Sequence, residues 1–341
     1  RDPLNYVAQI TRAQVLMEKG DIDAASDLLQ RFDTAYSQFP LETRKFRIKS
    51  MLARLLTEQG KLAEAAAKLE EALSINPDAK EENLALAQIY LSPGAVAGEK
   101  SLQAQALLEQ LLGRDPGDSR VEMLLAKAYQ ANQRYDVAAE LMLNQIERDA
   151  TQPAPHFELG IIRRAQGRLD EAIQSFEEAQ RLAPADQSPT FQLVTIDLGR
   201  QDFASAHRRA QQRLDRENGS EDAGAHYLKG LVYCSEQKWE EAEQALLRAT
   251  ELKPDSKDTY RLLIATHLTA GNQPKAIGLL ESLVEQEMID DEQLMQLTLL
   301  YEKGGNFAAA IAICEKKLAE DPNYVPALNN LAYLTGIMSD D

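Results

Sequence analysis

The strongest constraint on the fold is a segment of 34 residues that recurs along the chain. One copy, Pro153 to Asp186, reads PAPHFELGIIRRAQGRLDEAIQSFEEAQRLAPAD, and another, Ala223 to Ser256, reads AGAHYLKGLVYCSEQKWEEAEQALLRATELKPDS. Both have glycine or alanine at the eighth, twentieth and twenty-seventh positions and proline at the thirty-second. A fixed period of this length indicates stacked structural repeats rather than one compact core.

Each copy reads as two amphipathic helices joined by a tight turn, because apolar residues recur every three or four positions in both halves. In the first copy, Gly167 marks the turn and Leu169 begins the second helix. Gly160 and Ala172 allow the two helix backbones to approach closely, and Phe176 fills the space beside them. One hairpin cannot bury its own apolar face, so neighbouring hairpins must stack.

These positions resemble the tetratricopeptide repeat, and the resemblance covers nearly the whole chain. It implies an all-α fold, a right-handed superhelical α-solenoid of antiparallel helix pairs with about nine and a half repeats. Aromatic residues make up only 6% of the sequence and runs of β-branched residues are few, so no strand is predicted.

The repeat register predicts one continuous solenoid. Residues 1–218 hold units one to six, with an insertion near 91–101. Residues 219–341 hold units seven to nine and the lone first helix of a tenth. The sixth unit matches worst, since Asp197 stands where an aromatic residue is usual. The Asn-Gly-Ser sequence at 218–220 predicts a flexible joint near 218–222.

Charge and composition exclude several classes of protein. The net charge is −17, which argues against a nucleic-acid partner because no excess of cations is available to replace phosphate counterions. No stretch is apolar enough for a membrane span, so direct membrane insertion of this segment is not expected. The chain starts without methionine and ends inside a hairpin, and we interpret it as a piece of a longer protein.

No catalytic or cofactor-binding pattern is present, and we expect neither an enzyme nor a cofactor or metal. His156 and His226 share the fourth position of a first helix, where packing is the simpler interpretation. Cys234 and Cys314 lie two units apart, and we expect no disulfide between them.

The resemblance also implies a binding face. In the family, the second, fifth, ninth and twelfth side chains of each first helix line a concave inner wall. Carried over to this sequence, the fifth and ninth positions give these candidate partner-binding residues: Leu84, Met123, Lys127, Phe157, Ile161, Phe191, Tyr227, Leu231, Arg261, Met295 and Leu299. From the fifth unit on the wall is mostly apolar, which suits a hydrophobic peptide or an amphipathic helix. Alternatively, these residues touch adjacent helices or cover a segment of the same protein.

Three functions fit these observations. The first is a non-catalytic scaffold or adaptor that binds a partner protein in its groove and assembles a complex. The sequence is similar to bacterial repeat proteins, many of which work at the cell envelope in polysaccharide export, secretion or control of wall enzymes, often as lipoproteins. That similarity favours a periplasmic or envelope-tethered location, with the cytoplasm as the alternative. The second function is the substrate-recruiting arm of a larger enzyme such as a glycosyltransferase. The third is self-association through the incomplete tenth unit.

Overall fold

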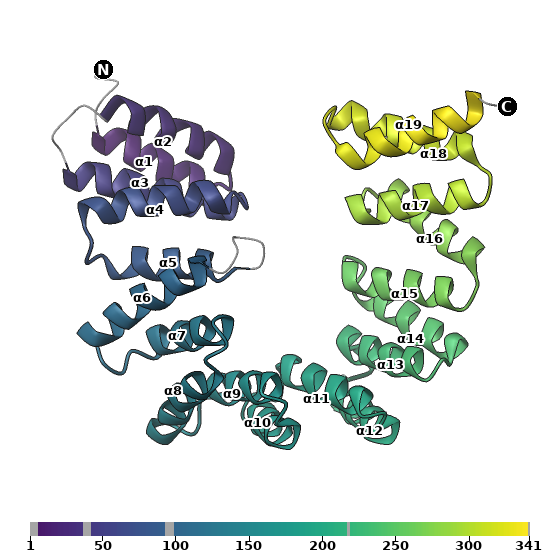
Figure 1. The fold of residues 1–341 in the computed structure, drawn as a ribbon, viewed down its shortest axis with the longest axis horizontal. Helices are drawn as coiled ribbons and strands as arrows, with labels where there is room; N and C mark the ends of the chain where they lie inside the picture. Colours follow the sequence, from purple (N-terminus) through teal and green to yellow (C-terminus); the bar gives the residue numbers. More distant parts are fainter. Residues whose placement is uncertain (1–5, 37–41, 93–98, 217–218, 340–341) are drawn as a thin grey trace. The chain divides into compact units, whose positions relative to one another are not determined.

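The computed structural model describes residues 6–36, 42–92, 99–216 and 219–339. This described part contains nineteen α-helices and one short 3₁₀ helix, η1 (Gly219–Glu221). Figure 1 shows the helices in chain order. Their bounds are α1 (Tyr6–Glu18), α2 (Ile22–Tyr36), α3 (Glu42–Glu58), α4 (Leu62–Ile75), α5 (Lys80–Tyr90), α6 (Glu99–Arg114), α7 (Ser119–Ala131), α8 (Tyr135–Arg148), α9 (Pro153–Ala165), α10 (Leu169–Leu182), α11 (Ser188–Gly199), α12 (Phe203–Leu214), α13 (Ala223–Ser235), α14 (Trp239–Leu252), α15 (Lys257–Thr269), α16 (Gln273–Glu285), α17 (Asp291–Lys303), α18 (Phe307–Glu320) and α19 (Val325–Ser339).

The chain divides into two compact units, Arg1–Pro184 and Ala185–Asp341. Within each unit the helices pack as successive antiparallel hairpins, and the second helix of each hairpin contacts the first helix of the next. First helices also contact one another, as α5 contacts α7 and α13 contacts α15. The predicted all-α solenoid of paired helices is therefore confirmed (Figure 1).

Small residues allow the helices of each hairpin to approach closely. A β-carbon built on Gly160 would lie 2.6 Å from the Phe176 ring, and one built on Gly230 would lie 2.6 Å from Leu246. Phe176 and Leu246 are fully buried, so the missing side chain of each glycine is the space that the larger residue occupies. The twentieth position is also fully buried in eight hairpins, and α6 of the third hairpin has the fully buried Ala104; the eight residues are Ala25, Ala65, Ala138, Ala172, Ala206, Ala242, Ala276 and Ala310. These are the packing roles that the sequence predicts.

Where the structure describes the turn inside a hairpin, that turn contains a residue with a left-handed backbone. Gly167 has φ +76°, a conformation that costs glycine little. Gln133, Gln201 and Gln237 occupy the same place in three other hairpins, with φ between 58° and 61°. Because a side chain at positive φ is strained, these three turns are less favourable than the glycine turns.

Two features of the predicted domain organisation fall partly outside the described residues. Residues 93–98 of the predicted insertion are not described, and α6 already begins at Glu99. Asn218 of the predicted joint is also outside, whereas residues 219–221 form η1. The boundary at residue 218 and the joint near 218–222 stay predictions.

Candidate partner-binding face

All eleven predicted binding residues lie on first helices of hairpins. Leu84 is on α5, Met123 and Lys127 are on α7, and Phe157 and Ile161 are on α9. In the second unit, Phe191 is on α11, Tyr227 and Leu231 are on α13, Arg261 is on α15, and Met295 and Leu299 are on α17. Their accessibility differs widely, so the face is not uniform.

In the first unit, the predicted residues divide between core and surface. Leu84 is buried, with 3% of its surface exposed, and belongs to the core that α3 to α9 share. Phe157 packs within its own hairpin, its ring centroid 5.5 Å from that of Phe176. Met123 and Ile161 are half-buried and Lys127 is exposed. Lys127 is therefore the most accessible to a partner, Met123 and Ile161 are partly accessible, and Phe157 also supports the fold.

In the second unit, several predicted residues already contact one another or nearby groups. Phe191 and Tyr227 stack with ring centroids 6.4 Å apart, and Phe191 is 37% exposed. A guanidinium nitrogen of Arg261 lies 2.6 Å from a carboxylate oxygen of Asp290. Leu299 is 44% exposed. This part of the face offers an aromatic pair and an exposed leucine, with the cation paired internally.

Two adjoining hollows lie on the first-helix side of α3, α5 and α7. One, of about 660 Å³, is lined by residues of α3, α4 and α5, among them Met51. The other, of about 620 Å³, is lined by residues of α5, α7, α8 and α9, among them Met123. Glu81 and Ala85 line both. Volumes of this size are typical of ligand sites.

Sequence reasoning placed the most apolar wall from the fifth unit onward, and of its eleven candidate partner-binding residues only Leu84 and Met123 line these hollows. Much of the lining comes from second positions such as Arg120 and from the end of α8, including Gln145 and Arg148. The second position was identified as wall-forming but yielded no candidates, and the end of a second helix carries no signal in a single sequence.

Charged groups that line the hollows are mostly paired. Arg120 forms a two-pronged ion pair with Glu81, at 3.2 and 3.0 Å, that joins α7 to α5. Arg148 pairs with the buried Glu122. The Arg54 Nε lies 3.2 Å from an oxygen of Glu58. The floor between these pairs is apolar.

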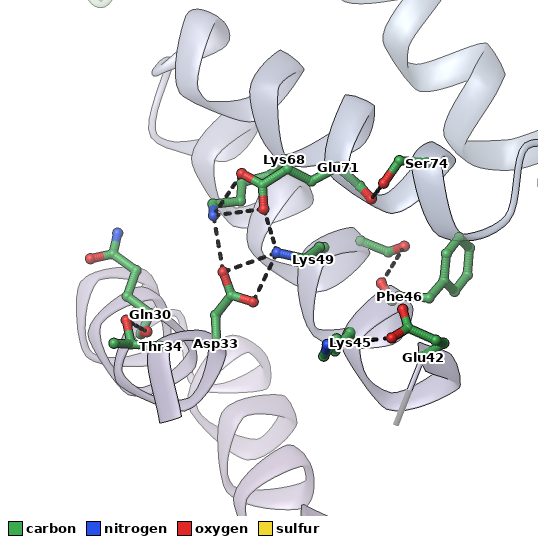
Figure 2. A network of polar contacts seen from close by, with 11 residues as sticks. Gln30, Asp33, Thr34, Glu42, Lys45, Phe46, Lys49, Lys68, Glu71 and Ser74 are labelled. Atoms are coloured by element: carbon green, nitrogen blue, oxygen red, sulfur yellow. Dashed lines mark hydrogen bonds and ion pairs between the residues drawn. The ribbon is translucent and has the colours of Figure 1, made fainter. Parts of the chain in front are cut away.

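A four-residue ionic network joins α2, α3 and α4 (Figure 2). The Asp33 carboxylate accepts hydrogen bonds from Lys49 at 3.1 Å and from Lys68 at 2.9 Å, and Glu71 pairs with both lysines. Burial alone would lower the pKa of Lys68, but its hydrogen bonds to Asp33 and Glu71 outweigh this and raise it. The network holds the first hairpin to the second.

Tyrosines at the eleventh position of first helices bind the preceding hairpin. The Tyr129 hydroxyl donates to Glu109 at 2.9 Å, and Tyr90 and Tyr301 donate in the same way to Glu70 and Glu281. Burial, followed by the Glu281 carboxylate, raises the pKa of Tyr301 to about 12. These hydroxyls therefore remain protonated at neutral pH and serve as structural donors.

The histidines and cysteines show structural surroundings. A ring nitrogen of His156 lies 3.1 Å from the Ala150 carbonyl oxygen, and His226 makes the same contact with Ser220, so each histidine ties the preceding loop to its helix. Both cysteines are free thiols, and burial raises the pKa of each. Neither thiol is thus activated as a nucleophile.

The described residues contain neither a metal-binding cluster nor a membrane-spanning helix. No group of three or more histidine, cysteine or acidic side chains there is arranged to hold a metal ion. In the same residues, none of the helices combines the length and apolar character needed to cross a membrane.

The fold and the face together define a helical-repeat protein whose first helices carry its hollows. The family model described as Tetratricopeptide repeat matches residues 50–99, 91–155, 123–187 and 191–257, which is more than half of the chain. The chain belongs to the tetratricopeptide repeat family. Repeats of this family generally bind proteins and are usually non-catalytic.

Individual similarities are more distant. A crystal structure of a tetratricopeptide repeat protein from Parabacteroides merdae matches 76% of this chain and 98% of its own, with TM-score 0.60 and 19% identity. ER membrane protein complex subunit 2-A of Xenopus laevis is 31% identical over 103 residues, and subunit 2 of Xenopus tropicalis matches equally. These matches span 30% of this chain and 35% of each frog protein. Since the similar proteins come from a bacterium and from frogs, a bacterial origin is not established.

Proposed function

We propose that this chain is a non-catalytic scaffold that binds a segment of a partner protein on its first-helix face and so assembles a protein complex. The observation that carries the proposal is the pair of adjoining hollows along α3, α5 and α7, whose floor is apolar and whose rim is charged. Apolar floors with polar rims are the usual anatomy of protein interfaces. The frog relatives, named as subunits of a membrane protein complex, support an assembly role.

Affinity capture with the full chain tests the proposal. Met123→Glu places a charge beside the floor of one hollow, while Leu102→Glu changes an exposed leucine of α6 that lines neither hollow. Proteins captured by the unmodified chain should be kept by the Leu102 variant and lost by the Met123 variant. Capture that is unaffected in a folded Met123 variant would contradict the proposal. Phe157→Glu is a poorer test because that ring packs on Phe176.

A location at a bacterial envelope, with a role in export, secretion or wall-enzyme control, is supported only by the similarity of the sequence to bacterial repeat proteins. A role as the recruiting arm of a larger enzyme rests on the same resemblance. Reading the gene beyond both ends distinguishes the two: an anchor sequence favours the envelope scaffold, and a nucleotide-sugar-binding fold favours the enzyme arm.

Self-association is a second candidate function, and a specific observation favours it. The last helix, α19, exposes Val325, Leu328 and Tyr333 by 61%, 44% and 57%. A second copy packing on this helix would cover them. Light scattering across concentrations should show reversible association that Leu328→Glu abolishes, and a monomer at all concentrations would exclude it.

A further inference from the structure

The side chains that line the two hollows have mostly used their polar capacity within the chain. Arg120, Arg148 and Arg54 each have a carboxylate partner, as described above. Arg47 and Glu82 line one hollow without a charged or hydrogen-bonding partner among the described residues, and their opposite charges cancel. Asp149 also lines a hollow, so over both hollows four arginines (Arg47, Arg54, Arg120 and Arg148) are matched by four carboxylates (Glu58, Glu81, Glu82 and Asp149), and a charged ligand meets no net charge. If a ligand carboxylate bound Arg120, Glu81 would lose its cation. One ion pair would then replace another, and the net binding free energy would be small.

Most hydrogen-bonding side chains in the hollows are committed in the same way, although the Gln88 amide and the Ser119 hydroxyl make no side-chain hydrogen bond among the described residues. The Ser50 hydroxyl donates to the Phe46 carbonyl at 3.0 Å, and Thr57 donates to Ala53 at 2.9 Å. The Gln145 amide donates to the Ser119 carbonyl at 3.2 Å. An extended peptide brings an unpaired backbone donor and acceptor at every residue, and a buried backbone group without a partner is costly. The hollows provide few groups to satisfy such a backbone.

An α-helix satisfies its own backbone hydrogen bonds and presents only side chains. The floor of the hollows is apolar, with Ala53 and Leu69 in one, Leu84 and Met123 in the other, and Ala85 in both. Two hollows that share a wall can take successive apolar side chains from one face of a helix. A helical occupant therefore needs the fewest hydrogen bonds from lining side chains that already have partners within the chain.

We propose that the occupant of these hollows is an amphipathic helix of a partner protein, which binds through an uncharged apolar stripe and not through a charged tail or an extended backbone. This inference rests on the proposed function and specifies the chemistry of its partner. It implies that binding depends weakly on salt, because no net charge is neutralised. It also implies that shape and apolar area at Met123 and Ala85 determine affinity.

Four synthetic peptides test the inference on the full chain by fluorescence anisotropy. Three are helix-forming peptides of about 18 residues, roughly five turns, with leucines at helical spacing on a neutral, glutamate-rich or lysine-rich background. The fourth is the neutral peptide with central prolines that prevent a helix. At about 300 mM salt, the neutral helix should bind more tightly than the other three peptides. The Kd of the neutral helix should change less than about threefold between about 50 and 300 mM salt.

Variants place the binding in the hollows. Met123→Ser should weaken binding of the neutral helix roughly tenfold, since it removes an apolar side chain that the bound helix would bury. Ala85→Gln places a larger side chain at the wall that the two hollows share and removes no core side chain, so it should weaken binding of the neutral helix by a similar factor. Leu102→Ser on α6 should leave that binding unchanged. Circular dichroism establishes that each variant is folded, and Ala85→Gln keeps the test decisive if Met123→Ser unfolds.

The outcomes separate this inference from the proposed function. Equal binding of the proline peptide, or tighter binding of a charged helix at about 300 mM salt, overturns the helical, uncharged occupant. If no peptide binds but a captured protein is still lost with Met123→Glu, the inference fails and the scaffold proposal stands. If capture is also indifferent to that variant, both fail.

Discussion

Gly160→Ala should change the free energy of unfolding through two opposing effects, a gain in helix propensity and a loss from overpacking. In a helix interior, alanine is favoured over glycine by about 1 kcal/mol. The new β-carbon would lie 2.6 Å from the Phe176 ring, which is fully buried and has no free space beside it. Overpacking of this kind costs about 1–3 kcal/mol. The packing cost should exceed the helix gain, and we expect a net loss of about 1 kcal/mol.

Gly278→Ala is the matched control. Gly278 lies inside α16, and no neighbouring atom lies within 4 Å of the place that a β-carbon would occupy there. Only the helix gain remains, so the variant should be more stable by about 0.5–1 kcal/mol. Combining Gly160→Ala with Phe176→Leu should cost less than the sum of the two single changes, because the smaller side chain makes room for the methyl group.

Urea unfolding followed by circular dichroism measures the net change in each variant. Hydrogen exchange in α9 and α10 localises it, since repeat arrays open in segments. If Gly160→Ala stabilises the protein as Gly278→Ala does, the close helix contact does not constrain this hairpin and the packing argument is refuted.

Three further predictions concern the turns and the ionic network. Gln133→Gly should stabilise the protein by about 0.5–1 kcal/mol in urea unfolding, because it relieves a left-handed side chain, whereas Gln103→Gly within α6 should destabilise it by about 1 kcal/mol. Asp33→Ala leaves two half-buried lysines with one carboxylate between them and should cost about 1–2 kcal/mol, while Glu42→Ala removes a carboxylate that is 61% exposed, against 14% for Asp33, and should cost less than about 0.5 kcal/mol; equal losses would show that burial of the carboxylate does not matter here. Hydrogen bonds from Lys49 and Lys68 outweigh burial and hold the pKa of Glu71 below its ordinary value of 4.5. The stability difference between the unmodified chain and Glu71→Gln should therefore be full above pH 4.5 and disappear as the pH falls through the lowered pKa, as thermal unfolding across pH can measure.

The hairpins and their packing could be predicted because single residues encode them. Gly160, Ala172 and Phe176 have sizes that fit only one arrangement of two close helices, and the structure has that arrangement. The turn at Gly167 is likewise local, since glycine adopts its left-handed backbone at little cost, although glutamine occupies the same place in three other hairpins.

The binding face could be predicted only in part. The candidate residues lie on first helices, as the repeat register predicts, but their accessibility depends on how neighbouring helices are spaced. Leu84 and Met123 share the fifth position, yet Leu84 is buried and Met123 remains half-exposed. The hollows depend on that spacing and on the end of α8, which a repeat register does not describe.

The eleventh position shows why a register alone does not determine chemistry. In α7 it holds Tyr129, whose hydroxyl binds Glu109 of the preceding hairpin. In α11 the same position holds Asp197, whose carboxylate instead lies 2.8 Å from Arg209 of its own hairpin. Burial raises the pKa of Asp197 despite this cation, so the pair bears a desolvation cost that the tyrosine contact avoids. One position thus joins two hairpins or stabilises a single hairpin, depending on the length and charge of the side chain, and the repeat pattern alone gives no means of choosing between them.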